Sequence, residues 1–258
     1  MVSVIILAKN EEKMILKCIN SVKEIASEII IIDNGSTDKT VEIAKNNNCR
    51  VLLSADSSFS NLRNIGLQNA TFDWVLYIDA DERVSPELTK EIIEVTQSSS
   101  NISGYILERT DYYFGRQRPV SSPMHRLFKK DKLQKWNGEL HETPQVEGSI
   151  GKLKNPLIHL THTDIDSMLV NTSKWSKKEA QLRFDINHPP IVWWRLLRVM
   201  FTAFYGSFVK QKGYKCGTEG WVEALYQSTS IYLTYARLWE LQNKAEISKR
   251  YQDIENKL

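Results

Sequence analysis

Residues 74–82 read Trp-Val-Leu-Tyr-Ile-Asp-Ala-Asp-Glu, an apolar run that leads into two aspartates two positions apart. A short run that is apolar at every position predicts a strand buried on both faces of a parallel sheet. Asp79 and Asp81 then lie at the edge where open α/β sheets bind ligands, with both carboxylates on the same side. Such a pair alone is more often a solvated turn, but its position after a buried strand favours a site for Mg²⁺ or Mn²⁺ that bridges a diphosphate.

Three further apolar runs precede this strand, and segments with helical spacing separate them. The runs are residues 2–7, 28–32 and 51–53. Strands alternating with helices in this way predict a parallel sheet with helices on both faces. Polar segments follow the first two strands, Ala8-Lys-Asn-Glu-Glu12 and Asp33-Asn-Gly-Ser-Thr-Asp38. We expect both to meet Asp79 on one rim, although the second is equally typical of a turn that caps a helix.

The pattern changes after residue 84. Ser85-Pro-Glu-Leu predicts a capped helix that ends near residues 98–100. After Gly104 the apolar period becomes two, which predicts antiparallel strands at 105–110 and 125–129 and therefore a mixed sheet. From residue 164 the pattern is helical, and Pro189-Pro190 predicts a boundary before an aromatic-rich tail.

Composition excludes several classes of protein. The 258 residues carry a net charge of +3, too balanced for a protein that coats nucleic acid, so no nucleic-acid partner is expected. Three widely spaced cysteines suggest neither a disulfide framework nor a zinc cluster, and a reducing cytoplasm is expected. The apolar N-terminus lacks the basic segment and cleavage site of a signal peptide. No apolar stretch reaches the roughly 18 residues of a membrane-spanning helix.

The C-terminal tail concentrates aromatic residues and positive charge. Twelve of the 25 aromatic residues lie between Trp193 and Trp239, and residues 174–215 carry nine basic residues against two acidic ones. Residues 191–209 predict a helix that buries most of its circumference, because its polar positions form only a narrow stripe. Basic residues around such a helix favour contact of residues 191–240 with an anionic membrane surface; the alternative is ordinary packing on the rest of the protein.

Four motifs together resemble a known enzyme family. They are Ala8-Lys-Asn-Glu11, Asp33-Asn-Gly-Ser-Thr-Asp38, Leu62-Arg-Asn64 and Asp79-Ala-Asp-Glu82. Their order and spacing resemble the nucleotide-sugar half of family 2 glycosyltransferases, which have the GT-A fold. His125-Arg-Leu-Phe128 and Trp136-Asn-Gly-Glu-Leu-His-Glu142 resemble, more loosely, the bacterial branch with lipopolysaccharide-core β-glucosyltransferases.

The resemblance implies a division of the chain. Residues 1–163 would form the α/β GT-A domain, a Rossmann-like, mostly parallel mixed sheet with flanking helices. Within it, residues 1–90 would bind the nucleotide sugar and residues 91–163 would hold the acceptor and catalytic groups. Residues 164–258 would form a helical extension. The oligomeric state is left open.

The resemblance also implies roles for residues of the donor half. Ala8, Asn10, Glu11 and Asp33 would hold the base and ribose, with Asp33 accepting a hydrogen bond from the uracil N–H. Arg63 would lie beside the base or the diphosphate. Departure of a nucleoside diphosphate leaves about two negative charges, which a cation and an arginine stabilise as they develop.

Further roles concern the cation. Asp79 would contact the ribose or a metal-bound water, and Asp81 would bind Mn²⁺ or Mg²⁺ directly. His159 is a tentative metal ligand, and His141 and Arg126 are other candidates for the site. His162 is less favoured than His159, because the family more often has an aromatic residue at its position. A lone histidine is otherwise more often a structural hydrogen-bonding residue.

An inverting transfer needs a base that deprotonates the acceptor hydroxyl. Glu142 is the preferred residue on the resemblance, with Glu139 and Glu82 as rivals, and a surface ion pair is the alternative for each. The implied enzyme transfers a sugar, first of all glucose, from a UDP-sugar to a bacterial surface glycan or glycolipid such as the lipopolysaccharide core. It would form a β-linkage at the inner face of the cytoplasmic membrane, as a peripheral protein.

Other functions stay open. The same chemistry on a peptide or protein acceptor is one, and a nucleotide-sugar-binding module without catalysis is another. A nucleotidyltransferase is disfavoured, because no glycine-rich phosphate loop follows the first strand.

Overall fold

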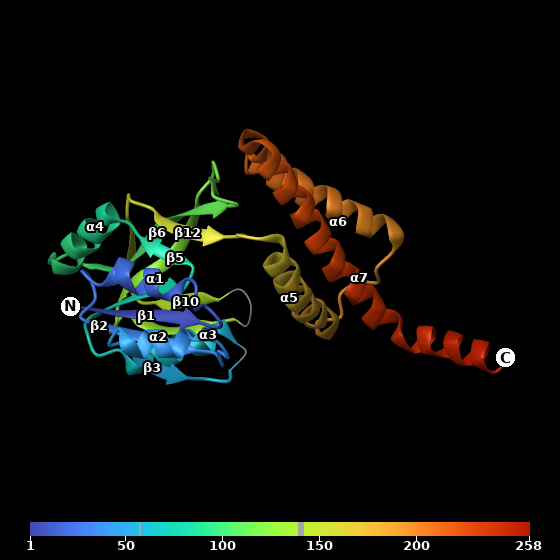
Figure 1. Cartoon of the computed structure of the whole chain (residues 1–258), viewed down its shortest axis with the longest axis horizontal. Coiled ribbons are helices and arrows are strands. Elements are labelled where there is room, and N and C mark those ends of the chain that lie inside the picture. The colour runs from blue at the N-terminus through green and yellow to red at the C-terminus, as the bar shows by residue number, and fades with distance from the viewer. Residues whose placement is uncertain (57, 139–141) are drawn as a thin grey trace. The chain divides into compact units, whose positions relative to one another are not determined.

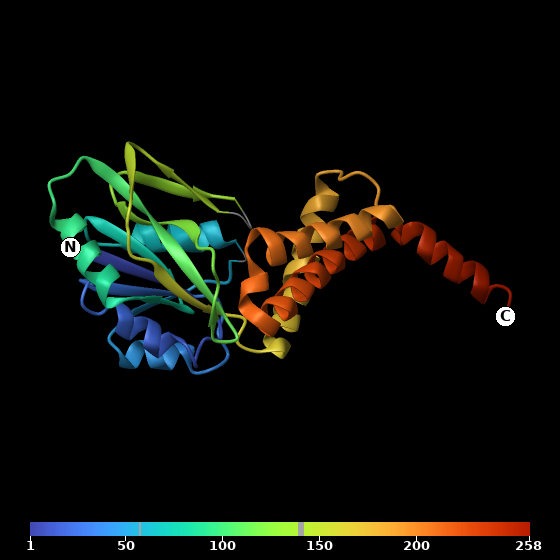
Figure 2. The same ribbon diagram turned by 90° about the horizontal axis from the view of Figure 1, so that it is seen from above.

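The computed structural model describes residues 1–56, 58–138 and 142–258 and divides the chain into two compact units (Figure 1). The first unit comprises Met1–Tyr112 and Ser121–Thr161, and the second comprises Tyr113–Val120 and His162–Leu258. The first is built from strands and helices, and the second is mainly helical (Figure 2).

The first unit alternates strands and helices through its N-terminal half. Its strands are β1 (Val2–Ala8), β2 (Glu28–Asp33), β3 (Arg50–Leu53), β4 (Trp74–Asp79), β5 (Glu82–Val84), β6 (Ile102–Tyr113), β8 (Ser122–Lys129), β9 (Leu133–Asn137), β10 (Thr143–Val146), β11 (Ser149–Lys152) and β12 (Leu157–Thr161). Its helices are α1 (Ile15–Val22), α2 (Thr40–Asn46), α3 (Phe59–Asn69) and α4 (Pro86–Gln97). The four predicted N-terminal strands are confirmed.

The main sheet is mixed, and its strand order begins β3-β2-β1-β4 and continues β8-β6-β12-β5. The first four strands in this order are parallel to one another. β8 then pairs antiparallel with both β4 and β6, as the change of period predicts. Ala8 pairs with Asp33 and Leu7 with Asp79, so the carboxyl ends of β1, β2 and β4 share one edge. The order of strands reverses between β1 and β4, the position where such sheets bind ligands.

Both faces of β1, β2 and β4 are buried, because successive side chains alternate between two cores. Val4 and Ile6 of β1 contribute to the core that contains residues of α1 and α4. Ile5 and Leu7 contribute to the core that contains residues of α3, β9 and the aromatic ring of Tyr77. The uninterrupted apolar runs that predicted these strands thus reflect burial on two sides.

Local signals at α3 and α4 explain how these helices are placed. A Cβ on Gly66 of α3 would lie 2.5 Å from the side chain of Ile5, so glycine permits a close approach of α3 to β1. Ser85 caps α4 by accepting a hydrogen bond from the backbone N–H of Leu88, and the helix ends at Gln97, as predicted. The close approach of α3 matters for the site, because this helix carries Arg63.

The second unit consists of helices and a short strand. Its elements are β7 (Arg116–Gln117), α5 (Ile165–Asp185), α6 (Trp193–Tyr205), a π-helical turn (Gly206–Lys210), a 3₁₀ turn (Gly213–Cys216) and α7 (Gly217–Glu255). α7 packs against both α5 and α6. Pro189 and Pro190 lie between α5 and α6, so they separate two helices of one unit. Among the described residues, no helix is long and apolar enough to span a membrane.

The expectation that residues 191–209 bury most of a helix is wrong. α6 begins at Trp193, and none of its residues is buried. Trp193 and Phe201 are 75% and 70% exposed, respectively. α6 packs against α7, but that contact leaves Trp193, Leu197 and Phe201 mostly exposed.

Candidate active site

Hydrogen bonds tie the loop after β1 to the loop after β2. Asn10 has a positive φ of 56°, and its Oδ1 accepts from the backbone N–H of Thr37 at 2.7 Å. The backbone N–H of Asn10 donates to Ser36 Oγ, and that of Glu11 donates to Thr40 Oγ1. The two polar segments predicted to meet on one rim are therefore hydrogen-bonded to each other. They lie beside the position where the strand order of the sheet reverses.

Asp33 lies buried at the end of β2, and its two carboxylate oxygens have different surroundings. Its Oδ2 accepts from the backbone N–H groups of Gly35 at 3.1 Å and Ser36 at 3.0 Å. Its Oδ1 is buried and has no hydrogen-bond partner among residues 1–56, 58–138 and 142–258. A buried acceptor without a partner costs about 1–3 kcal/mol, so this atom is suited to an N–H from a ligand.

Two arginines surround Asp79 at the end of β4. Arg126 Nη2 lies 2.6 Å from Asp79 Oδ2, and Arg63 Nη2 lies 3.2 Å from Asp79 Oδ1. Burial opposes the negative charge of Asp79, but Arg126 and Arg63 outweigh it and hold the pKa of Asp79 below its usual range. Asp79 is thus a charged residue with both oxygens bonded, which suits contact with a ligand hydroxyl better than direct binding of a cation.

One expectation about this part of the sheet is wrong. Glu82, a rival for the catalytic base, is fully buried and pairs with Arg126 at 2.8 Å, so no acceptor reaches it. Burial raises the pKa of Glu82, Arg126 opposes that effect, and Asp79 and Asp81 add to it. Arg126, a candidate for the site, is 1% exposed and contacts both Asp79 and Glu82.

Arg63 of α3 links the two halves of the site. Its guanidinium contacts Asp79 and also Glu142, with Nε 3.1 Å and Nη2 3.0 Å from Glu142 Oε1. The rings of Trp136 and Tyr77 lie 5.1 and 5.6 Å from the guanidinium carbon, respectively. Arg63 Nη1 is buried and has no hydrogen-bond partner in the described part of the chain. This donor is therefore oriented and available to an anionic ligand.

The neighbouring Asn64 holds the hairpin of β9 and β10 against α3. Asn64 Nδ2 donates to the carbonyl of Trp136 at 3.0 Å, and the backbone N–H of Trp136 donates to Asn64 Oδ1 at 2.8 Å. Glu142 directly precedes β10 and is half-buried. The Leu62-Arg-Asn64 motif thus combines a buried leucine, an arginine in the site and an asparagine that fixes the segment carrying Glu142.

Asp81 contacts His159, and Asp111, which was not among the predicted site residues, contacts the other nitrogen of this histidine. His159 Nε2 lies 3.1 Å from Asp81 Oδ2, and His159 Nδ1 lies 2.7 Å from Asp111 Oδ1. Burial opposes protonation, but the bonds to Asp111 and Asp81 outweigh it and raise the pKa of His159 to about 9. Arg109 lies 3.0 Å from Asp111. The only sequence signal for Asp111 was its period-two spacing from Arg109 on a strand.

The carboxylates of this rim favour a cation. Burial, the charge of Asp81 and then the charge of Asp38 raise the pKa of Glu11 to about 7. The described residues include no group of three or more His, Cys, Asp or Glu placed to hold a metal ion. Mg²⁺ and similar cations commonly use one or two carboxylates together with substrate phosphates. Asp81, with its side chain 32% exposed, fits a cation that a diphosphate helps to bind.

The remaining sequence candidates fall in different places. Ala8 is buried at the end of β1, so only its backbone can face a ligand. His162 belongs to the second unit, where its Nδ1 lies 2.9 Å from Glu223 Oε2 and its ring lies 4.6 Å from that of Tyr113. His141 and Glu139 lie outside the described residues.

Comparisons with known proteins agree with this geometry. The family model described as "Glycosyl transferase family 2" matches residues 3–146. An uncharacterized glycosyltransferase of Rickettsia prowazekii is 28% identical over 95% of this chain and 89% of its own length. The lipopolysaccharide core biosynthesis glycosyltransferase LpsC of Rhizobium meliloti is 25% identical over 92% of each chain.

The chain is also similar to a solved structure. Glucosyl-3-phosphoglycerate synthase from Mycobacterium tuberculosis, in complex with Mn²⁺, uridine-diphosphate and phosphoglyceric acid, is 17% identical with a TM-score of 0.46. That similarity covers 73% of this chain and 79% of the other. The family match covers more than half of the chain and coincides with the mixed sheet and its rim, as expected for the GT-A fold. The chain belongs to glycosyl transferase family 2 and is a glycosyltransferase.

Proposed function

We propose that this enzyme transfers a sugar from a UDP-sugar, first of all UDP-glucose, to a hydroxyl of a bacterial surface glycan precursor such as the lipopolysaccharide core. The transfer inverts the anomeric centre, forms a β-linkage and uses Mn²⁺ or Mg²⁺. The observation that carries the proposal is the buried Asp33 Oδ1 without a hydrogen-bond partner among the described residues, at the same sheet edge as Asp79.

Base recognition follows from the chemistry of that oxygen. A carboxylate accepts but does not donate, so Asp33 Oδ1 selects a base with a ring N–H. Uracil offers such a group, whereas neutral adenine and cytosine offer only ring acceptors at the corresponding edge. Asn10, Glu11 and the backbone of Ala8 would line the base and ribose beside it. Glycine at position 35, with φ 74°, lets the backbone turn at this edge.

The leaving diphosphate would meet Arg63. Its Nη1 has no partner among the described residues, and its other nitrogens are held by Glu142 and Asp79. A fixed guanidinium stabilises the charge that develops on the departing group without reorganising. A bound Mn²⁺ or Mg²⁺, held by Asp81 with His159 nearby, would supply further charge neutralisation.

Glu142 is the proposed base. It lies on the segment before β10, and Arg63 orients its carboxylate. In this arrangement one guanidinium contacts both the proposed base and Asp79, at 3.0 and 3.2 Å. A bound diphosphate would contact the same guanidinium, so Arg63 would be shared between Glu142 and the donor. Glu142 would then take the proton from the acceptor hydroxyl.

The acceptor half of the proposal rests on the relatives and on the second unit. A relative named for lipopolysaccharide core biosynthesis matches 92% of the chain, which supports a glycan or glycolipid acceptor. Such acceptors are assembled at the inner face of the cytoplasmic membrane, and contact of residues 191–240 with that surface is part of the proposal. Residues 1–163 would then perform the chemistry and residues 164–258 would position the enzyme.

Calorimetric titration tests the donor site. UDP, GDP, ADP and CMP are titrated into the full chain with and without Mn²⁺. We expect UDP to bind most tightly and to depend on Mn²⁺, with the dependence lost in Asp81→Ala. Asp131→Ala is the matched control, because the side chain of Asp131 is 71% exposed and pairs with the neighbouring Lys132. Absence of nucleotide binding, or full sugar transfer by Asp81→Ala, contradicts the proposal.

A further inference from the structure

The outward face of α6 carries large apolar side chains that the described part of the protein leaves uncovered. Trp193, Leu197 and Phe201 are 75%, 59% and 70% exposed, and Tyr205 follows at the same spacing of four. Residues four apart on a helix form one continuous stripe. The rings of Phe201 and Tyr205 stack at 6.3 Å between centroids, so the stripe is ordered along the helix.

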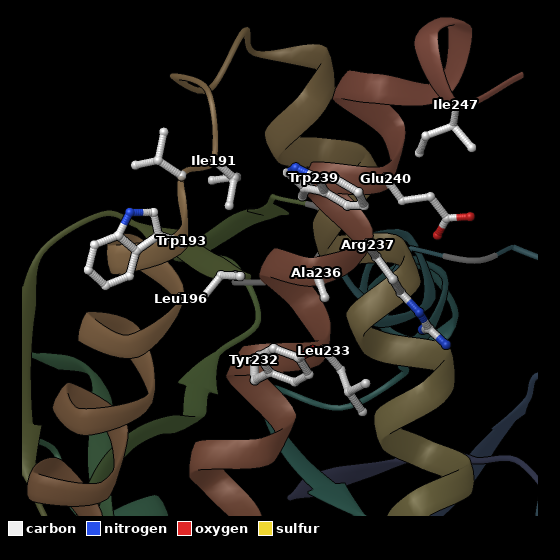
Figure 3. Close-up of a pocket in the computed structure, with 11 residues that line it drawn as sticks. Ile191, Trp193, Leu196, Tyr232, Leu233, Ala236, Arg237, Trp239, Glu240 and Ile247 are labelled. Atoms are coloured by element: carbon white, nitrogen blue, oxygen red, sulfur yellow. The ribbon is translucent and has the colours of Figure 1, made fainter. Parts of the chain in front are cut away.

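The apolar surface continues from this stripe into a groove beside α7 (Figure 3). The groove has a volume of about 640 Å³, and Trp193 and Leu196 line it from α6. Tyr232 and Trp239 line it from α7. Extended apolar patches of this kind mark interaction surfaces in water-exposed proteins, because removal of apolar side chains from water is favourable.

The charge around α6 indicates which kind of partner can bind this apolar face. Residues 186–218 contain five basic residues and no acidic residue. Arg195 and Arg198 each lie 5.7 Å from the ring of Trp194, so positive charge borders the aromatic stripe. A partner with negative charge at its surface and hydrocarbon beneath it complements such a face.

A second copy of this chain does not complement it. In a symmetric dimer the same face meets itself, so Arg198, which is exposed, would meet a second cluster of arginines. Like charges at an interface are unfavourable, and no carboxylate in residues 186–218 compensates for them. A bilayer containing anionic lipids satisfies both the apolar stripe and the basic border.

We propose that α6 lies in the interface of an anionic membrane, with Trp193, Leu197 and Phe201 directed toward the acyl chains. Arg195 and Arg198 contact the phosphate headgroups. The proposal adds the helix face and the lipid class to the membrane contact of the proposed function. It rests on that function only in the assumption that the acceptor lies at a membrane. The test below contains no sugar nucleotide and no acceptor, so the two proposals fail separately.

The experiment measures partition of the full chain onto vesicles. Vesicles of phosphatidylglycerol with phosphatidylethanolamine are compared with vesicles of phosphatidylcholine, at low and high salt. We expect binding to the anionic vesicles at low salt, and a loss of at least about tenfold in the double variant Trp193→Ser/Phe201→Ser. The variant Arg195→Gln/Arg198→Gln should lose about tenfold on anionic vesicles.

Matched controls separate insertion from unfolding and from non-specific adhesion. Tyr251→Ser removes an aromatic ring that is 66% exposed on α7 and should bind vesicles like the unsubstituted chain. The double variant at Trp193 and Phe201 should retain its circular dichroism spectrum and its thermal unfolding temperature, because these side chains are exposed and belong to the second unit.

A direct readout places the face in the bilayer. Cys18, Cys49 and Cys216 are buried, so a cysteine introduced as Leu197→Cys can be labelled selectively with a polarity-sensitive dye. Its emission should shift to the blue on anionic vesicles, whereas a dye at Tyr251→Cys should not shift. Equal shifts at both positions, or no binding to anionic vesicles at low salt, would overturn the proposal. A dimer that Trp193→Ser/Phe201→Ser dissociates would overturn it in favour of a second copy as the occupant of this face.

Discussion

Arg63 donates a hydrogen bond to Glu142, which lies 79 positions further along the chain, at 3.1 Å from Nε to Oε1. The same guanidinium contacts Asp79 at the end of β4 at 3.2 Å. One buried arginine therefore connects the proposed base with the strand that bears the acidic pair. Because Arg63 is 3% exposed and lies near two aromatic rings, it has little freedom to move away from this position.

Removing the charge of Glu142 tests its role as base. Glu142→Gln keeps the shape and a hydrogen-bond acceptor for Arg63 but cannot take a proton. We expect kcat for sugar transfer to fall by about 10²- to 10⁴-fold while the Kd for UDP changes little. Glu147→Gln, on an exposed position of the same segment, should leave kcat unchanged. Near-normal turnover by Glu142→Gln would assign the proton to another group.

Asp33→Asn tests recognition of the base. The amide can still accept from Gly35 and Ser36 through its oxygen, but it then presents an NH₂ where Oδ1 now lies. An N–H facing the uracil N–H should raise the Kd for UDP by about 10- to 100-fold, the equivalent of 1–3 kcal/mol. Thermal unfolding shows whether the fold is retained. An unchanged Kd for UDP would mean that Asp33 only shapes its loop.

Glu11 gives a pH dependence of stability with a defined sign. Its folded pKa is about 7, above the ordinary value of 4.5, so the folded state holds this proton more tightly than the unfolded chain. The associated stability is fully present below pH 4.5 and is lost as pH rises through 7. Glu11→Gln removes this loss, so the variant should gain stability relative to the unsubstituted protein between pH 5 and pH 8.

Urea unfolding of both proteins without divalent cation, at several pH values in that range, measures this difference. The gain is expected to be roughly 1–3 kcal/mol, reduced from the full shift because Glu11 is partly exposed. A difference that is constant with pH would show that Glu11 does not titrate in this range.

Asp111 is expected to matter for the cation through His159. Its Oδ1 lies 2.7 Å from Nδ1 of the histidine whose Nε2 faces Asp81. Asp111→Asn should raise the Mn²⁺ concentration needed for half-maximal activity by about 10- to 100-fold, because the histidine loses its charged orienting partner. Glu108→Gln is the control, because Glu108 lies on β6 like Asp111 but pairs with Lys152 of β11. Equal Mn²⁺ requirements in both variants would make Asp111 a purely structural residue.

The sequence alone determined the parallel half of the sheet and most of the residues at its rim. Short apolar runs identified β1, β2, β3 and β4, and those of β1, β2 and β4 reflect burial on both faces of the sheet. Chain order then placed Asp33 and Asp79 at the same edge, since parallel strands share their direction. These inferences needed only local patterns.

Only the tertiary structure decided how distant residues pair. His159 and Asp111 lie 48 positions apart, and no local pattern reveals that their strands bring them within 2.7 Å. Glu82 was considered as a base or as part of a surface ion pair, but it is buried and pairs with Arg126 inside the sheet. α6 shows the opposite error, because its apolar composition predicted burial while α7 covers only one side of it. Composition determines whether burial of a helix is favourable, but the number of elements that cover the helix depends on the packing of the whole chain.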